Sequence, residues 1–261
     1  MSFKTLGWLT SARDEAAVEL LVKVYEKIKS GFIPLELKYV FLSREEDEGE
    51  FARQIIEFCK EEKIKVIKFS ALRFKPELRA KDKEKWRIEF HEKVMELLEE
   101  TDFCILAGYM WIVSEEFCKK LKLINLHPAL PGGPKGAWED VMWQLISARS
   151  AETGAMMHLV TPELDEGPAV SFFRINIRSE EFEKLWQEAE PLLLKHHLSG
   201  VKKLYGEKFP LFQKIREEEL KREIPLIIFT LKAVAEGRVE VPPSEGPIDL
   251  SEEIEEYIKT L

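Results

Sequence analysis

The feature that most constrains the fold is an alternation, through the first half of the chain, of short apolar segments with longer amphipathic ones. The apolar segments have the length and composition of buried strands, and they are Thr5–Thr10, Leu35–Leu42, Val66–Ser70 and Phe103–Ala107. The segments between them repeat apolar residues at helical spacing, and they predict helices that begin at Ser11 or Asp14 and that cover Glu50–Glu62 and Glu84–Glu99. Strands that alternate with helices form a parallel sheet. We therefore predict an α/β fold with a Rossmann-like, doubly wound, mainly parallel sheet.

Two polar residues mark the end of a further strand. Leu123–Leu126 is a short apolar segment, and Pro128 ends it because proline cannot donate a hydrogen bond to the sheet. Residues two apart on a strand point to the same face, so Asn125 and His127 are expected to project together. The C-terminal end of a parallel strand is where open α/β sheets bind ligands. A turn amide beside a structural histidine is the alternative interpretation of this pair.

A second polar motif follows the helix predicted at Trp138–Ala148. The strands Thr153–Thr161 and Ala169–Ile175 are joined by the loop Pro162–Pro168, which contains Asp165. An aspartate two residues before a glycine usually serves a turn. A carboxylate that orients an imidazole is also a recurrent catalytic unit, so Asp165 is a candidate partner of His127.

These motifs occur in one order and spacing along the chain. They are Asn125-Leu126-His127-Pro128-Ala129-Leu130-Pro131, Lys135-Gly136-Ala137, Thr153-Gly154, Met157-His158-Leu159-Val160-Thr161 and Glu163-Leu164-Asp165-Glu166-Gly167-Pro168. Together they resemble the catalytic half of the formyltransferases that use 10-formyltetrahydrofolate. That family includes glycinamide ribonucleotide formyltransferases, methionyl-tRNA formyltransferases and formyltetrahydrofolate hydrolases. The resemblance covers residues 4–178 well and residues 215–240 weakly.

The resemblance implies a formyl transfer mechanism without a metal or a covalent nucleophile. Asn125 and His127 would donate hydrogen bonds to the formyl oxygen as negative charge develops there. Asp165 would orient His127 and help to remove the amine proton, directly or through water. Asp165, His127 and His158 could be imagined as metal ligands, but the position of His158 among apolar strand residues favours a hydrogen-bonded core histidine.

The resemblance also assigns residues to the folate donor. The segment after the fourth strand would line the pterin pocket together with residues near Asp165, and these positions are Tyr109, Met110, Trp111, Ile112, Val113, Thr161, Glu163 and Leu164. Purine-pathway members commonly carry arginine where this chain has Trp111. The alternative for most of these apolar side chains is a plain core role. Arg87 falls near a position that contacts the folate tail, although a solvated helix-face arginine is the commoner state.

The expected acceptor site includes the turn after the first strand. The turn after the first strand is glycine-rich in glycinamide ribonucleotide formyltransferases, where it holds a phosphate, but here it reads Thr10-Ser11-Ala12-Arg13-Asp14. Amides at a helix start can still bind an anion, so Ser11, Arg13 and the loop residue Lys135 are the candidate substrate-binding residues. An ordinary capped helix beside a solvated Arg13 is the alternative.

The last quarter of the chain has a different, helical character. We expect a catalytic domain at residues 1–178 and a helical extension at residues 179–261, with an insertion at about residues 185–212. The pattern predicts a helix over Glu180–Leu198 interrupted at Pro191, a connector through Gly200 and Gly206, separate helices over 211–223 and 225–237, and a short acidic helix over 250–261. His196 and His197 are expected at the surface or at an interface.

Composition limits the remaining function classes. A formal charge of −9 argues against a general nucleic-acid surface, and no apolar run is long enough to span a bilayer. Cys59, Cys104 and Cys118 lack paired spacing, which favours buried free thiols in a reducing compartment over disulfides or a zinc site. With no signal peptide visible, we expect a cytoplasmic protein, with a homo-oligomer as the alternative to a monomer. Only two asparagines and four glutamines occur, as in proteins from hot habitats, so Asn125 stands out.

The expected activity is transfer of a formyl group from 10-formyltetrahydrofolate to a primary amine, with glycinamide ribonucleotide as the favoured acceptor. Hydrolysis of the donor to formate, and transfer to a sugar-nucleotide amine, are the alternatives. A tRNA formyltransferase would carry a basic C-terminal barrel, whereas this tail is acidic and helical. A folate-binding or scaffold protein without turnover is the alternative from another class, but it would need no set of Asn125, His127 and Asp165.

Overall fold

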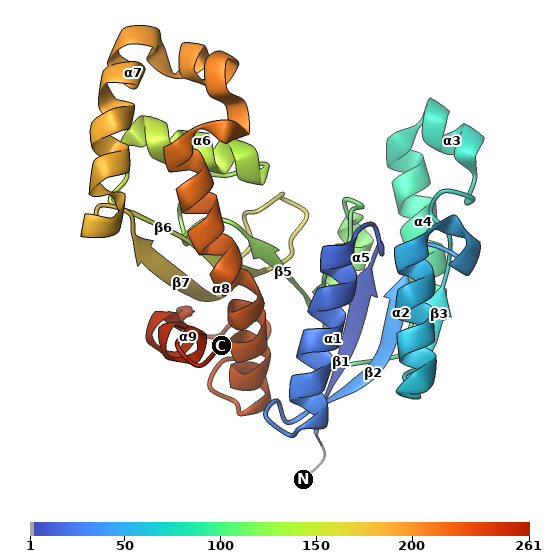
Figure 1. The fold of residues 1–261 in the computed structure, drawn as a ribbon. Helices are drawn as coiled ribbons and strands as arrows, with labels where there is room; N and C mark the ends of the chain where they lie inside the picture. Colours follow the sequence, from blue (N-terminus) through green and yellow to red (C-terminus); the bar gives the residue numbers. More distant parts are fainter. Residues whose placement is uncertain (1–2) are drawn as a thin grey trace. The chain divides into compact units, whose positions relative to one another are not determined.

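A computed structural model describes residues 3–261 (Figure 1), and these residues form an eight-stranded sheet in the order β3-β2-β1-β4-β5-β6-β7-β8. The strands are β1 (Lys4–Thr10), β2 (Leu35–Leu42), β3 (Val66–Lys68), β4 (Phe103–Leu106), β5 (Leu123–His127), β6 (Glu152–Leu159), β7 (Ala169–Asn176) and β8 (Ile248–Asp249). The helices are α1 (Glu15–Lys29), α2 (Glu50–Glu61), α3 (Pro76–Lys81), α4 (Lys83–Leu97), α5 (Glu115–Lys120), α6 (Trp138–Ala148), α7 (Glu180–Tyr205), α8 (Pro210–Ala235) and α9 (Ser251–Ile258), with 3₁₀ turns at Glu46–Glu48 and Gly206–Lys208. The predicted α/β class with a mainly parallel sheet is confirmed.

The chain divides into two compact units. Unit 1 comprises residues 3–125, 158–168 and 231–245, and unit 2 comprises residues 126–157, 169–230 and 246–261. The boundary falls inside β5, between Asn125 and Leu126, and inside β6 and α8.

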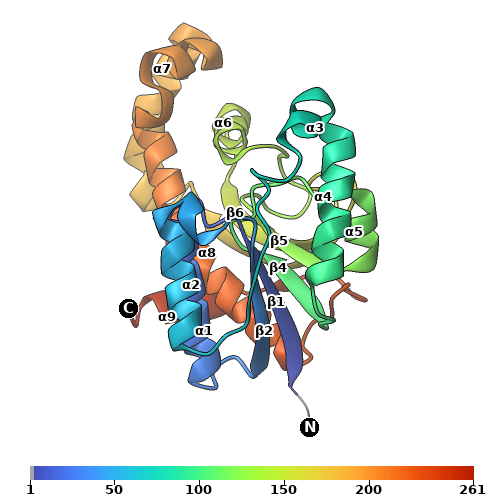
Figure 2. The same cartoon turned by 90° about the vertical axis from the view of Figure 1, so that its right-hand side faces the viewer.

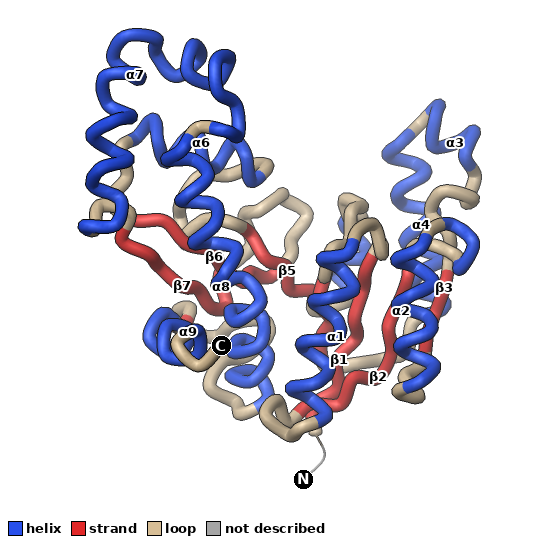
Figure 3. Tube along the Cα trace, in the orientation of Figure 1, coloured by secondary structure: helices blue, strands red, loops and turns tan. Residues whose placement is uncertain are grey.

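Unit 1 contains the doubly wound part of the sheet. Strand β1 pairs in parallel with β2 on one side and with β4 on the other, and β2 pairs with β3. Strands β1, β2 and β3 lie side by side in Figure 3. Helices α1 and α2 cover one face of these strands, whereas α4 and α5 cover the other (Figure 2). On the α4 side, Phe90 is fully buried and stacks on Trp86 at 5.0 Å between ring centroids. From β1 the strand order runs outwards to β2 on one side and to β4 on the other. Sheets of this kind bind ligands where the strand order reverses, which here is between the C-terminal ends of β1 and β4.

Unit 2 has its own core beneath helices α6, α7 and α8. Buried side chains of α6 pack on those of α7 and α8, including Met142, Trp186 and Ile215. Trp143 contacts Phe209 and Phe212, with ring centroids 5.8 and 4.9 Å apart. Burial of these large apolar surfaces is the main stabilising contribution in this part of the chain.

Several predicted helix boundaries are wrong. Helix α7 continues through Pro191 and Gly200 to Tyr205, and its break lies at His197, with φ 54° and ψ 169°. Helix α8 runs through Pro225 as one helix from Pro210 to Ala235, where two were expected. The residues after Pro225 are buried, so packing holds them helical despite the missing N–H. The short helix α3 and strand β8 were not predicted.

Other expectations concern the environment of the chain. Cys59 and Cys104 are buried free thiols, as the sequence predicted, whereas Cys118 is only partly buried. No helix among residues 3–261 combines the length and apolar character that a membrane span requires.

Candidate functional site

The turn after β1 anchors the segment that follows β4. The Ser11 hydroxyl is buried, and its oxygen accepts hydrogen bonds from the Met110 N–H and the Ser43 hydroxyl, both at 2.9 Å. The Ser43 oxygen in turn accepts a hydrogen bond from the Trp111 indole at 3.0 Å. Ser11, predicted to bind substrate, is therefore a structural link between the ends of β1 and β2 and the segment 109–113.

The same turn contains a backbone conformation that glycine usually adopts, although the turn has no glycine. Ala12 has φ 46°, in the left-handed region that glycine normally occupies. Helix α1 then begins with Asp14 as its N-cap, whose carboxylate accepts a hydrogen bond from the Ala17 N–H, and with Glu15 in its first turn. Two carboxylates at the helix start oppose the binding of a further anion there. Arg13 is exposed, and it is the cation of this turn.

The segment 109–113 separates into core and exposed side chains. Tyr109 is buried, and its hydroxyl lies 3.2 Å from His91 Nε2. Burial lowers the pKa of His91 to about 4, so at neutral pH its Nδ1–H donates to the Arg87 carbonyl and its Nε2 accepts from Tyr109. By contrast, Met110 and Ile112 are 53% and 59% exposed. The exposed side chains of Met110 and Ile112 are available to contact a ligand. The buried Tyr109 anchors the same segment in the core.

Trp111 borders an apolar pocket of about 600 Å³ in unit 1. Its ring lies 5.2 Å from that of Trp86, and the Arg79 guanidinium lies 5.7 Å from the Trp111 ring centroid. Arg87 and Lys83 also line this pocket. Aromatic walls with a cationic rim suit a flat ring attached to an anionic group.

Strand β5 carries Asn125 and His127, as predicted. His127 is 3% exposed, and its Nε2–H donates to the Pro134 carbonyl at 3.0 Å. The loop that supplies Pro134 also contains Lys135, which is exposed, and the Lys135 carbonyl accepts a hydrogen bond from the Gln144 side chain. The loop thus contacts His127 through its backbone.

Asp165 lies in the loop between β6 and β7 with φ 58°, a left-handed conformation that aspartate tolerates better than most residues. Gly167 closes this loop, since a Cβ there would lie 1.7 Å from the Leu159 carbonyl oxygen. The Thr161 hydroxyl donates to the Glu163 carbonyl at 3.0 Å, and Leu164 is 63% exposed. Thr161, Glu163 and Leu164 therefore form the same loop as Asp165.

His158 faces Asp165, which the sequence analysis did not predict. The prediction of a buried, hydrogen-bonded core histidine is confirmed, because His158 is 2% exposed and its Nδ1 lies 3.0 Å from the Leu159 carbonyl oxygen. Its Nε2 also lies 3.9 Å from Asp165 Oδ1. The signal was present in the sequence, since a strand residue a few positions before a tight loop can reach the residues of that loop.

The structure thus brings Asp165 together with His158, and Ser11 together with the segment 109–113. Asn125, Asp165 and the expected folate-binding residues belong to unit 1, whereas His127 and Lys135 belong to unit 2.

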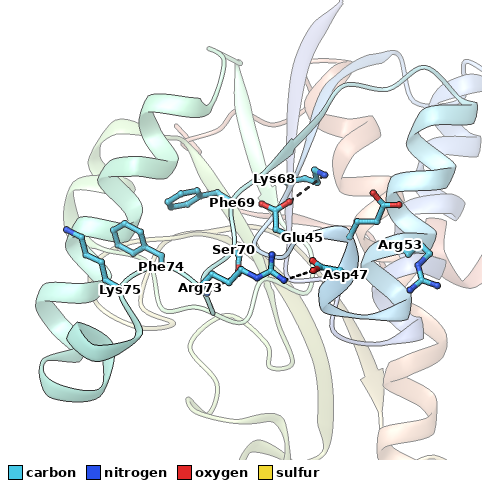
Figure 4. A pocket seen from close by; sticks show the side chains of 10 residues that line it. Glu45, Asp47, Arg53, Lys68, Phe69, Ser70, Arg73, Phe74 and Lys75 are labelled. Atoms are coloured by element: carbon cyan, nitrogen blue, oxygen red, sulfur yellow. Dashed lines mark hydrogen bonds and ion pairs between the residues drawn. The ribbon is translucent and has the colours of Figure 1, made fainter.

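A further pocket of about 760 Å³ lies at the C-terminal ends of β2 and β3 (Figure 4). Arg73 pairs with Asp47 at 2.7 Å, and Lys68 pairs with Glu45 at 3.5 Å. These pairs neutralise much of the charge that lines the pocket, so it offers no strong preference for an anion or a cation. None of the residues predicted from the sequence lines it.

Comparison with known proteins identifies the family. A family model described as formyl transferase matches residues 41–189, which is more than half of the chain. The chain belongs to the formyl transferase family. The match includes Asn125, His127, Asp165, Lys135 and every expected folate-binding position, but it excludes Ser11 and Arg13.

Curated relatives of two kinds match this formyl transferase chain. Phosphoribosylglycinamide formyltransferase of Schizosaccharomyces pombe is 33% identical over 123 residues, which cover 43% of this chain and 58% of that protein. Formyltetrahydrofolate deformylase 2, mitochondrial, of Arabidopsis thaliana is 32% identical over 118 residues, which cover 44% of this chain and 35% of that protein. The alignments therefore span little more than half of the one relative and about a third of the other.

Solved structures of the same two kinds share the fold. Glycinamide ribonucleotide transformylase 1 from Symbiobacterium toebii superposes with a TM-score of 0.59 at 18% identity, over 94% of this chain and 92% of that chain. A formyltetrahydrofolate deformylase from Pseudomonas putida KT2440 gives 0.53 at 21% identity, over 91% and 67% of the two chains. At these identities the likeness shows the fold alone.

Proposed function

We propose that this chain transfers a formyl group from 10-formyltetrahydrofolate to a primary amine, with Asn125, His127 and Asp165 as the catalytic residues. The observation that carries the proposal is the order of these residues, Asn-x-His at the end of β5 and Asp in the loop after β6, inside the region that matches the family. The buried His158 beside Asp165 supports it, because it gives the carboxylate a fixed neighbour.

The chemistry follows from these residue types. The amine nitrogen attacks the formyl carbon, and the carbonyl oxygen becomes an oxyanion that accepts hydrogen bonds from the Asn125 amide and the His127 imidazole. Asp165 accepts the proton of the amine, directly or through water. The bond from the formyl carbon to the donor nitrogen then breaks, that nitrogen takes up a proton, and tetrahydrofolate leaves. Since His127 Nε2–H donates to the Pro134 carbonyl in the structure, donation from this nitrogen to the oxyanion requires the loop to release it.

The folate donor is assigned to the segment 109–113 and to Thr161, Glu163 and Leu164. Support comes from Met110, Ile112 and Leu164, each more than half exposed, since large apolar side chains in water favour a ligand that covers them. The aromatic pocket beside Trp111, with Arg79 and Arg87 near it, has the chemistry of a site for the ring and the carboxylates of the folate tail.

Glycinamide ribonucleotide is the first acceptor to test, because relatives that match this chain carry names of that activity. Arg13 and Lys135 are the proposed acceptor contacts, and the buried Ser11 is proposed to hold the folate-binding segment 109–113 through the Met110 N–H. The carboxylates of Asp14 and Glu15 at the start of α1 argue against a phosphate bound there in the usual way. Hydrolysis of the donor is the second candidate, and it is favoured by the deformylases among the relatives.

A spectrophotometric assay of folate product from 10-formyltetrahydrofolate separates these candidates. Product that appears only when glycinamide ribonucleotide is added supports the purine-pathway acceptor. Product without any amine supports the hydrolase. No product with a panel of amines that includes sugar nucleotides would contradict both and would favour a folate-binding protein without turnover.

A further inference from the structure

The loop 131–137 of unit 2 precedes helix α6, and its position decides which group His127 Nε2–H can reach. Its Pro134 carbonyl accepts the hydrogen bond from His127 at 3.0 Å. Gly132 and Gly136 have φ 76° and 110°, values that glycine adopts more readily than other residues. A Cβ at either glycine would meet no heavy atom within 4 Å beyond its chain neighbours. The segment between the two glycines is therefore free to move, and its place depends on what anchors the ends of the loop.

Trp138 is the anchor at the C-terminal end of this loop. It is the first residue of α6, and the N-cap before it is Ala137, whose side chain makes no capping hydrogen bond. The first turn of α6 therefore depends on the packing of Trp138, whose half-buried ring lies 5.9 Å from the ring of Phe212 in α8. The Gln144 side chain of α6 donates to the Lys135 carbonyl at 3.2 Å, so the loop is tied to the same helix.

Arg216 of α8 covers the Trp138 ring. Its guanidinium lies 4.9 Å from the ring centroid, and the Arg216 side chain is only 18% exposed. A cation over the face of a tryptophan is attracted by the ring, and the attraction is larger where water is largely excluded. Arg216 therefore adds a specific contact to the apolar packing of Trp138.

Two carboxyl groups of α8 fix the Arg216 guanidinium in this place. Glu223 accepts a hydrogen bond from Arg216 Nη1, and Glu219 Oε2 lies 3.6 Å from the same nitrogen. Glu219 is fully buried, and its other oxygen accepts a hydrogen bond from the Thr153 hydroxyl in β6. Arg216 is thus held from its own helix and from the sheet. It is the fixed side of the contact, and Trp138 is the side that it holds.

We propose that Arg216 is a positioning residue, which fixes the loop 131–137 through Trp138 so that the loop presents Lys135 to the acceptor amine. The inference rests on the proposed function for the role of Lys135. The effect of Arg216 on the loop itself does not depend on turnover.

This anchor is compatible with the release of His127 that formyl transfer requires. Gly136 lies between Pro134 and Trp138, so Pro134 can leave His127 Nε2 while Trp138 stays against Arg216. Arg216 therefore confines the movement to the segment between the two glycines and keeps the end of the loop in register with α6.

The first test is limited digestion of the intact chain with trypsin, with cleavage after Lys135 followed by mass spectrometry. Lys135 is exposed, and the bond after it becomes a good substrate only when the loop leaves its place. Arg216→Met should raise the rate of this cleavage about 5-fold, the factor that corresponds to the loss of one partly desolvated cation–π contact. Arg216→Lys keeps a cation against Trp138 and should restore most of the protection. An equal rise of cleavage after the exposed Lys195 of α7 would indicate a general loss of stability and would overturn the proposal.

Arg178→Met is the matched control, because Arg178 makes the same kind of contact elsewhere in unit 2. Its guanidinium lies 3.6 Å from the Trp186 ring centroid, and Trp186 belongs to α7. This variant should leave cleavage after Lys135 within about 2-fold of wild type, as expected for a site without shared contacts. Equal rates after Lys135 in the Arg178→Met and Arg216→Met variants would overturn the proposal.

The second test is steady-state kinetics with glycinamide ribonucleotide and 10-formyltetrahydrofolate, each varied in turn. Arg216→Met should raise the KM for the amine about 5-fold and leave the KM for the folate nearly unchanged, because Lys135 is the acceptor contact on this loop. Arg216→Lys should restore the KM for the amine. Turnover with an unchanged KM for the amine and unchanged cleavage after Lys135 would refute this inference alone. Absence of turnover by the wild-type chain would refute the proposed function alone, since trypsin still reports the state of the loop.

Discussion

At the scale of single residues, Asp165 combines a left-handed backbone with a carboxylate 3.9 Å from the buried His158. Both features hold the side chain in one place, which is what a proton-transfer group needs. We predict that Asp165→Asn lowers kcat by about 10²-fold or more, since that is the usual contribution of a general base. Folate binding, measured by fluorescence titration, should change by less than about 3-fold, or ~0.6 kcal/mol. Turnover close to wild type would remove Asp165 from the mechanism.

Ser11, which the sequence predicts as a substrate contact, also holds the segment 109–113 by hydrogen bonds within the fold. Its oxygen holds the Met110 N–H, so Ser11→Ala should loosen the segment 109–113 at a cost of about 1 kcal/mol. We predict a rise in KM for the folate donor of about 5-fold, with little change in KM for the acceptor. Steady-state kinetics with each substrate varied in turn measures this, and Ser30→Ala, which removes a hydroxyl near the surface, is the control. A rise confined to the acceptor KM would restore Ser11 as an acceptor contact.

At the scale of elements, α8 places two neighbouring glutamates in opposite electrostatic environments. Burial raises the pKa of Glu219 to about 8, even though Thr153 donates a hydrogen bond to it and Arg216 lies nearby. Burial also opposes ionisation of Glu218, but hydrogen bonds from Lys214, Lys221 and Arg222 lower its pKa to about 2. The two residues therefore contribute to stability in different pH ranges.

In the folded protein the pKa of Glu219 lies above the ordinary value of 4.5. The contribution of this carboxyl group to the free energy of unfolding is therefore complete below pH 4.5 and is lost as the pH rises towards 8. We predict that the free energy of unfolding falls through this range with a slope of up to about 1.4 kcal/mol per pH unit from this group. Glu219→Gln should remove that slope, whereas Glu188→Gln, on the exposed side of α7, should leave it. For Glu218 the sign is reversed, and its contribution is lost only as the pH falls from 4.5 towards 2. Urea unfolding at a series of pH values measures both, and an unchanged profile for Glu219→Gln would show that this carboxyl is not the source.

At the scale of the whole molecule, the sequence predicted what depends on local pattern. The alternation of apolar strands and amphipathic helices was enough for the sheet, and Pro128 correctly marked the end of β5. Helix α8 was divided wrongly at Pro225, because the burial of the residues after it depends on packing that the sequence pattern does not reveal. The hydrogen bonds from Ser43 to Ser11 and from Trp111 to Ser43 join residues 32 and 68 positions apart.

The most direct test of the central claim follows a labelled formyl group on 10-formyltetrahydrofolate through incubation with this chain and a panel of amines. The account predicts that the label leaves the folate and appears on an amine, and that Asn125→Ala, His127→Ala and Asp165→Asn each slow the transfer by about 10²-fold or more. Label released as free formate in the absence of any amine would keep the catalytic residues and change the acceptor to water. Label that stays on the folate under all conditions, in a chain that binds the folate, would contradict the account.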